Sequence, residues 1–287
     1  MRNLKYWFSI FCIGLIISCT EIVELDLNND TNHRLVVEGK VSSLSQIQHV
    51  RLSWSSNYFY NQQSPAVSGA MVSISDGSNT YLLKEKTAGM YQTDSGVVGV
   101  VGKVYKLNIR LSDGFVCEAS DTLYPVSDID SMKFSPKYYD RFSDDSIYNL
   151  YMYAQEPHGI GNFYLWEYSI DNQSYTDTLR QKSFTDDAQV DGSYIYDFDV
   201  FRIKDRHLKN DSALITFFHS SISRKYYDFV IALMLETDWR GSPFDGPPAN
   251  VPGNISNGAL GFFHATDVKK IENYLYRNPK QVFMKSE

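Results

Sequence analysis

Short runs with an apolar residue at every second position recur from residue 35 onward. In residues 103–111, for example, Tyr105, Leu107 and Ile109 alternate with polar residues. A period of two places such side chains on one face of a β-strand, whereas a helix would need a period near 3.6. The chain is therefore expected to be mostly β.

Two Asp-Gly pairs, at positions 76–77 and 113–114, separate runs of this kind. Asp-Gly between alternating runs is a strong hairpin signal, because the turn needs a residue that tolerates a positive φ. Six or seven short strands with turns at this spacing predict a sandwich of immunoglobulin or transthyretin type over residues 35–124. The strands are expected at 35–41, 49–54, 70–75, 81–84, 89–91, 103–111 and 115–119.

The second half, residues 125–287, is predicted to be a β-rich domain that carries one helix, at about 223–237. Its helical face would comprise Tyr226, Phe229, Val230, Leu233 and Thr237. Either Ser221 or Ser223 could cap the start of this helix, and Gly241 and Pro243 would end it. Strands are expected at 148–154, 163–170, 194–203, 213–219 and 259–264. Since 287 residues exceed a typical single domain, two domains are the natural expectation.

The N-terminus resembles a bacterial lipoprotein signal. Arg2 and Lys5 precede an apolar run at 7–17 that is too short for a bilayer span of about 20 residues. The run ends in Ile-Ile-Ser-Cys at 16–19, which resembles a lipobox. We expect cleavage after Ser18 and a diacylglycerol on Cys19, so that 1–18 is a signal peptide. An ordinary secretory signal or a short membrane anchor is the alternative.

Residues 19–34 are polar and acidic and are expected to form a tether between the lipid and the body of the protein. Acidic residues soon after a lipidated cysteine resemble the signal by which some Bacteroidota send lipoproteins to the cell surface. The whole chain is acidic as well, with a formal charge of −7, which disfavours nucleic acid as a partner. Beyond Cys12 and Cys19, Cys117 is expected to face a core and leaves no intrachain disulfide.

The lipobox and the acidic tether are followed by distinctive runs at 35–39, 68–76, 162–166, 243–248, 253–258 and 261–263. Together these segments resemble a Bacteroidota lipoprotein family known as domain of unknown function 4249. The resemblance covers nearly all of the mature chain. It implies an outer-membrane lipoprotein that is often found with TonB-dependent transporters, and it implies no reaction and no catalytic residues.

No catalytic or metal-binding pattern stands out in the sequence. No two of the 6 histidines lie within five residues of each other, and neither a Gly-x-Ser-x-Gly elbow nor a phosphate-binding loop occurs. The acidic residues between Asp186 and Asp199 could offer oxygen ligands to calcium, but their spacing is not that of a calcium loop. A solvated loop followed by a strand is the alternative. We therefore expect no enzyme activity, no metal and no cofactor apart from the lipid on Cys19.

The loop at 242–257, rich in Pro and Gly, is the candidate binding segment. Its Phe244 and the nearby Trp239 could grip a ligand or partner, with Asn254 and Asn257 as polar contacts. The alternative is a plain connection between helix and strand.

Two functions from different classes follow. The first is a non-enzymatic accessory protein on the cell surface that helps a TonB-dependent outer-membrane transporter to capture a nutrient. The second is a structural or adhesive surface lipoprotein. A surface hydrolase is a third, less favoured hypothesis.

Overall fold

Strands dominate the part of the chain that the computed structural model describes, which is residues 33–56, 64–94, 96–142, 144–237 and 251–277. The chain divides into a unit at 1–33, of which only His33 is described, and a compact unit at 34–287. No helix among the described residues has the length and apolar character needed to cross a membrane. The predicted mostly-β fold is confirmed, and α2 is the one α-helix in the described ranges.

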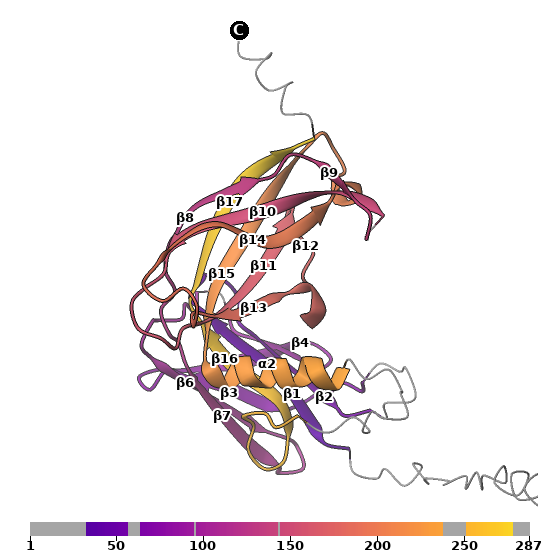
Figure 1. Cartoon of the computed structure of the whole chain (residues 1–287). Coiled ribbons are helices and arrows are strands. Elements are labelled where there is room, and N and C mark those ends of the chain that lie inside the picture. The colour runs from indigo at the N-terminus through magenta and orange to yellow at the C-terminus, as the bar shows by residue number, and fades with distance from the viewer. Residues whose placement is uncertain (1–32, 57–63, 95, 143, 238–250, 278–287) are drawn as a thin grey trace, which may run out of the picture. The chain divides into compact units, whose positions relative to one another are not determined.

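An eight-stranded sheet contains the N-terminal strands in the order β16-β1-β2-β5-β4-β3-β6-β7 (Figure 1). Its neighbours are antiparallel, except for the parallel pair β1 and β16. The strands are β1 (Leu35–Ser42), β2 (His49–Trp54), β3 (Met71–Ser75), β4 (Thr80–Thr87), β5 (Met90–Gln92), β6 (Val104–Arg110), β7 (Val116–Thr122) and β16 (Leu260–Thr266).

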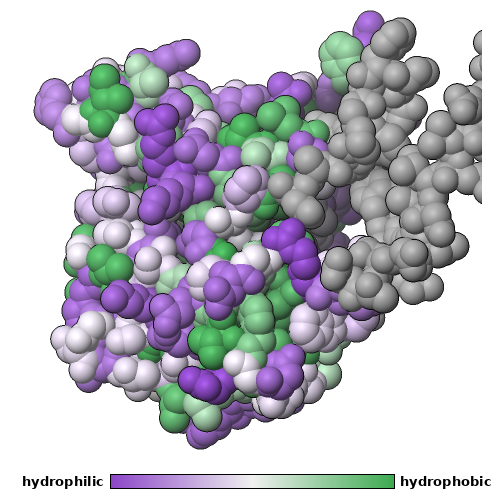
Figure 2. All heavy atoms as spheres, turned by 90° about the horizontal axis from the view of Figure 1, so that it is seen from below, coloured by the Kyte–Doolittle hydropathy of each residue, from purple (hydrophilic) through white to green (hydrophobic). Residues whose placement is uncertain are grey.

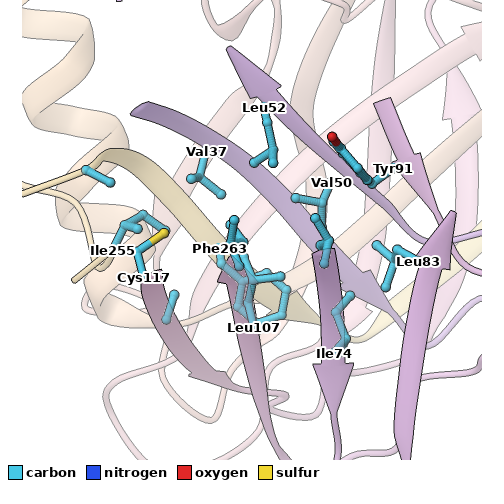
Figure 3. Close-up of a cluster of buried hydrophobic side chains, with 14 of the residues drawn as sticks. Val37, Val50, Leu52, Ile74, Leu83, Tyr91, Leu107, Cys117, Ile255 and Phe263 are labelled. Carbon is cyan, nitrogen blue, oxygen red and sulfur yellow. The ribbon is translucent and has the colours of Figure 1, made fainter. Parts of the chain in front are cut away.

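Alternation along these strands builds one apolar core. In Figure 3, side chains such as Val37, Leu52, Ile74, Leu107 and Phe263 gather from several different strands into this interior. All five of these side chains are fully buried, as the alternation predicts.

Both predicted Asp-Gly hairpins form. Asp76 accepts hydrogen bonds from the N–H groups of Ser78 (2.9 Å) and Asn79 (2.7 Å), and Gly77 has φ +88°. At the second turn, Asp113 accepts from the N–H of Phe115 (2.9 Å). The carboxylate of each aspartate thus accepts hydrogen bonds from backbone N–H groups within its own turn.

Side chains bring the two edge strands of this sheet, β7 and β16, together. The amide of Asn254 donates to the carbonyls of Ser120 (3.2 Å) and Phe263 (2.7 Å), and its oxygen accepts from the N–H of Phe263 (2.9 Å). Asp121 accepts from the N–H of Ala265 (3.0 Å). The edges are therefore covered by polar side chains rather than left as unpaired ladders.

The C-terminal strands form two further sheets around a second core. One has the order β14-β10-β8, with β9 paired to β10; the other has the order β12-β11-β15-β17, with β13 paired to β11. Their strands are β8 (Ile129–Phe134), β9 (Tyr138–Asp140), β10 (Asp145–Gln155), β14 (Tyr194–Lys204), β11 (Phe163–Ile170), β12 (Gln173–Ser174), β13 (Ser183–Asp186), β15 (Ser212–Ile222) and β17 (Val268–Tyr276), with short 3-10 turns η1 (Leu179–Gln181) and η2 (Asp205–His207).

Helix α2 (Arg224–Thr237) is capped at its start by Ser223, whose hydroxyl accepts from the N–H of Tyr226 (3.2 Å). Of the two candidate caps, Ser223 is therefore the one used. The ring of Tyr226 stacks on His264 of β16 at 3.9 Å between centroids, and Val230 is 1% exposed. Thr237, predicted on the same side of the helix as Val230, is exposed, and its hydroxyl donates to carbonyls of the preceding helical turn.

The division at residues 35–124 and 125–287 stays a prediction. Strand β16, which comes late in the chain, joins the sheet of β1–β7, and Phe263 lies in that sheet's core. The chain thus returns to its first sheet before β17 completes the five-stranded one.

The surface seen in Figure 2 carries apolar residues in small groups separated by polar ones. Exposed apolar residues also occur singly on the strands, such as Met71, Leu82 and Val104. Scattered apolar residues are ordinary on a folded protein. A cavity is therefore a better candidate for a ligand site than this surface.

Candidate functional site

A cavity of about 230 Å³ lies between the two C-terminal sheets. The four-stranded sheet contributes β10 and β14, and the five-stranded sheet contributes β11, β13 and β15. Its lining includes Met152, Ala154, Glu156, Tyr164, Trp166, Asp186, Phe198 and His219. We call this site the aromatic cavity.

Aromatic rings form much of its wall. Tyr164 and Trp166 alternate along β11 and so point to the same side, where their rings lie nearly parallel at 6.5 Å between centroids. The edge of Phe198 from β14 meets Trp166 at 5.3 Å. Tyr164 and Trp166 are buried, whereas Phe198 is 37% exposed, so Phe198 lies at the mouth of the cavity.

His219 lies in this wall in a fixed, neutral form. The indole N–H of Trp166 donates to Nδ1 of His219 at 2.7 Å, and Oγ of Ser127 lies 3.3 Å from Nε2. Because an indole nitrogen can only donate, Nδ1 must be unprotonated and Nε2 must carry the hydrogen. Burial lowers the pKa of His219 to about 4, against a smaller opposing effect of Asp267.

This tautomer has a chemical consequence for Ser127. Since Nε2 carries the proton, it donates to the serine and cannot take the serine's proton. The Ser127–His219 pair is therefore not arranged as a nucleophile and its base.

Glu156 supplies a buried carboxyl to the cavity, at 2% exposure. Its Oε1 accepts from the hydroxyl of Tyr164 (2.6 Å) and from the amide of Asn162 (3.2 Å). Within the described part of the chain, Oε2 accepts no hydrogen bond. Burial raises the pKa of Glu156 in spite of these two donors, and the charges of Asp187 and Asp191 raise it further.

The loops beside Glu156 are held together by two carboxylates. Asp187, which is buried, accepts from the N–H groups of Gly161 (3.0 Å) and Asn162 (3.1 Å), and Asp191 accepts from the N–H of Gly159 (2.6 Å). These aspartates therefore organise the rim of the cavity.

The same aspartates belong to the segment considered for calcium. Among the described residues, no three His, Cys, Asp or Glu side chains are grouped so as to hold a metal ion. Calcium binding between Asp186 and Asp199 stays an untested alternative.

A larger, more polar cleft of about 320 Å³ lies between β1 and the five-stranded sheet. Two carboxylates in its wall, Glu167 and Glu272, are already paired with Lys182 (2.6 Å) and Lys270 (3.2 Å). The aromatic cavity combines an apolar wall with a carboxyl oxygen that has no partner, which is the more usual composition of a ligand site.

Of the binding residues expected from the sequence, the two that the structure describes, Asn254 and Asn257, do not line the aromatic cavity. Trp239 and Phe244 fall outside the described residues, as does Cys19. Asn254 bridges β7 and β16, and the amide of Asn257 donates to the carbonyl of Val116 (2.6 Å). Both asparagine amides are thus engaged within the protein, and a role for them in binding stays a prediction. Cys117 is fully buried, as expected, and burial raises the pKa of its thiol to about 11.

The sequence predicts a strand at 163–170, which contains Tyr164 and Trp166, but does not mark either residue as part of a site. Their alternation on one strand was visible, but Glu156 and His219 come from segments far apart in the chain and carry no local pattern. Only the packing of β11 against β15, and of the two sheets against each other, brings these groups together.

The family described as Domain of unknown function (DUF4249) matches residues 20–272. The chain belongs to this family. The match covers all the strands described above except the end of β17, so the aromatic cavity of this DUF4249 protein lies wholly within it. A search of curated proteins finds no match.

Among solved structures, one titled "Cytokine receptor complex - Crystal form 1A" aligns with 86% of this DUF4249 chain and 99% of its own. The identity is 9% and the TM-score is 0.22. A likeness at this level carries no information about the function of the DUF4249 protein.

Proposed function

We propose that this protein is a lipid-anchored lipoprotein of the bacterial outer membrane, of Bacteroidota origin, that faces the cell surface. It binds a small ligand in the aromatic cavity and acts without catalysis as an accessory of a TonB-dependent transporter. The observation that carries the binding role is the cavity itself, where buried rings and a carboxyl oxygen without a partner face one enclosed space.

Binding without bond-making fits the state of the polar groups in that space. Both nitrogens of His219 are already engaged by Trp166 and Ser127, and Glu156 is the buried carboxyl of the cavity. A histidine that is fixed in this way can orient a ligand but is not free to take a proton from it.

The proposed membrane localisation rests on the N-terminal sequence. A charged start, an apolar run and Cys19 at the end of a lipobox-like segment support a signal at residues 1–18 and an acyl anchor. Each buried CH₂ of an acyl chain contributes roughly 0.8 kcal/mol, so two or three chains hold a protein firmly on a membrane. The tether at 19–34 would let the body of the protein reach a partner beside it.

Affinity purification of the full-length lipidated protein from detergent-solubilised outer membranes tests the proposal. A TonB-dependent transporter should be recovered together with it. The matched control is Cys19→Ser, which keeps the folded body and removes the anchor, and recovery should fall sharply with it. Purification of the lipoprotein alone, under conditions that preserve other outer-membrane complexes, overturns the transporter role.

A structural or adhesive role is the second candidate, and the exposed tyrosines of the four-stranded sheet favour it. Tyr139 is 59% exposed and Tyr196 is 73% exposed. Tyrosine is common at protein contact surfaces because it joins an apolar ring to a polar tip. Under this hypothesis, deletion of the protein changes cell attachment and leaves growth on a limiting nutrient unchanged.

A further inference from the structure

The charges around the aromatic cavity have one sign. Glu156 and Asp186 line it, and none of the described lining residues is a lysine or an arginine. Its single histidine, His219, is kept neutral by burial, and the hydrogen bond from Trp166 fixes its tautomer. A ligand in this space therefore meets negative charge and no compensating cation.

The geometry of Glu156 leaves one oxygen for a ligand. Tyr164 and Asn162 both donate to Oε1, which fixes the carboxyl group in place, while Oε2 has no hydrogen-bond partner among the described residues. Because Glu156 lines a largely enclosed space, a donor that reaches Oε2 from the cavity forms a stronger, charge-assisted hydrogen bond there than it would in water.

The rings of Tyr164, Trp166 and Phe198 add a second source of attraction for positive charge. The faces of aromatic rings are negative, and a desolvated organic cation within about 6 Å of a ring centroid is attracted to them. Rings and a carboxylate around one space are thus complementary to an ammonium group.

We propose that the aromatic cavity selects a small organic cation, an amine without a carboxylate of its own, whose ammonium group binds Oε2 of Glu156 between the rings. This inference rests on the proposed binding function and names its ligand class. A zwitterionic amino acid is disfavoured because its carboxylate would find no basic partner in the wall. At about 230 Å³, the cavity lies below the roughly 300–1,000 Å³ typical of drug-sized ligands, so the amine must be small.

The ligand and protons compete for Glu156. Tyr164 and Asn162, from β11 and the loop before it, face this carboxyl. Asp187 and Asp191, in the loop after β13, act on it as well. Asp186 and neutral His219 lie in the wall of the same cavity. Since burial and the acidic neighbours favour the protonated form, acidification should weaken the binding of a cation and leave a neutral ligand unaffected.

Isothermal titration of the full chain with three probes of one shape tests the inference: benzylamine, benzyl alcohol and benzoate. At pH 7.5, benzylamine should bind at least tenfold more tightly than benzyl alcohol, and benzoate should not bind. Lowering the pH to 5 should weaken benzylamine alone.

Two variants locate the charge. Glu156→Gln should lose the tenfold preference for benzylamine while it keeps its affinity for benzyl alcohol, which also shows that the cavity is still folded. Glu118→Gln, on an exposed position of β7, removes the same charge from the chain outside the cavity and should bind like the wild type.

Equal affinities for the amine and the alcohol, or tightest binding of benzoate, overturn the cation preference and leave the binding function standing. If none of the three probes binds, the inference is likewise overturned. The proposed function is then decided by the purification of a transporter partner, which does not depend on the charge of the cavity.

Discussion

Nε1 of Trp166 donates a hydrogen bond to Nδ1 of His219 at 2.7 Å, across the neighbouring strands β11 and β15. The two residues are direct partners in the strand register, so the contact is set by the pairing itself. This contact fixes the neutral tautomer of His219, and the burial of the same imidazole makes the stability of the fold depend on acid.

His219→Gln should reduce the loss of stability that acid causes. Histidine has a pKa near 6.5 in the unfolded chain, and burial lowers it to about 4 in the folded protein. Between these values only the unfolded state takes up the proton, so the free energy of unfolding falls as pH drops from 6.5 toward 4, by about 3 kcal/mol at most. Glutamine can replace both hydrogen bonds but does not titrate.

Urea unfolding between pH 7.5 and pH 4.5 measures this difference. The wild type should lose more stability over this range than the variant. The exposed His158→Gln serves as the control and should follow the wild type. Equal slopes for His219→Gln and the wild type contradict a neutral, buried imidazole.

Asn254→Ala should destabilise the first sheet by about 1–3 kcal/mol, since three hydrogen bonds between β7 and β16 depend on one amide. Asn257→Ala removes one hydrogen bond, to Val116, and should cost less. Denaturant midpoints of the two variants give the comparison. A neutral effect of Asn254→Ala would show that the two edges are held together without its amide.

The strands were predictable where neighbours in sequence are neighbours in space. Alternation predicted the strands β1–β7. The Asp-Gly pairs predicted two hairpins, because the aspartate carboxylate accepts hydrogen bonds from N–H groups of its own turn. Strand β17 escaped prediction, since Lys269, Lys270 and Glu272 give it a polar sequence. The parallel pairing of β16 with β1 joins segments more than 200 residues apart, and no local pattern encodes it.

The aromatic cavity was not predictable for a related reason. A binding site of this kind depends on which side chains from separate strands converge, and a period of two gives only the face on which each one lies. The prediction instead favoured the loop at 242–257 for its Pro and Gly content. In the described part of that loop, Asn254 joins β7 to β16, and the amide of Asn257 donates to the first residue of β7.

Gly261→Ala should prevent stable folding of the first sheet. Gly261 has φ +91°, and a Cβ there would lie 2.0 Å from the carbonyl oxygen of Val37 on β1. An alanine in this left-handed backbone conformation costs about 1–2 kcal/mol of stability, and the clash with Val37 destabilises the variant further. Gly258→Ala is the control: its φ is +73°, but the space around it is open, so only the first cost applies. Circular dichroism and thermal unfolding should separate the two variants, and similar melting temperatures would contradict the close approach of β16 to β1.

Cys117 should resist alkylation in the folded protein. Its side chain is fully buried, and burial raises the pKa of the thiol to about 11, so the reactive thiolate is scarce at neutral pH. Mass spectrometry of the peptide that contains Cys117, after iodoacetamide treatment at pH 8, should show little modification without denaturant and complete modification in 6 M guanidinium. Rapid labelling of the native protein would mean that β7 opens easily.

Cys19 should carry acyl chains at a new amino end of the protein. The apolar run at 7–17 is shorter than a membrane span, so the proposed membrane attachment rests on lipid at this residue. Mass spectrometry of the N-terminal peptide from membrane fractions should show cleavage after Ser18 and a mass increase from acylation. Cys19→Ser should remain uncleaved or leave the membrane fraction, whereas Cys117→Ser, which changes the other mature cysteine, should keep the wild-type distribution. An unmodified or uncleaved N-terminus in the wild type would remove the membrane anchor and, with it, the physical basis for a partnership with an outer-membrane transporter.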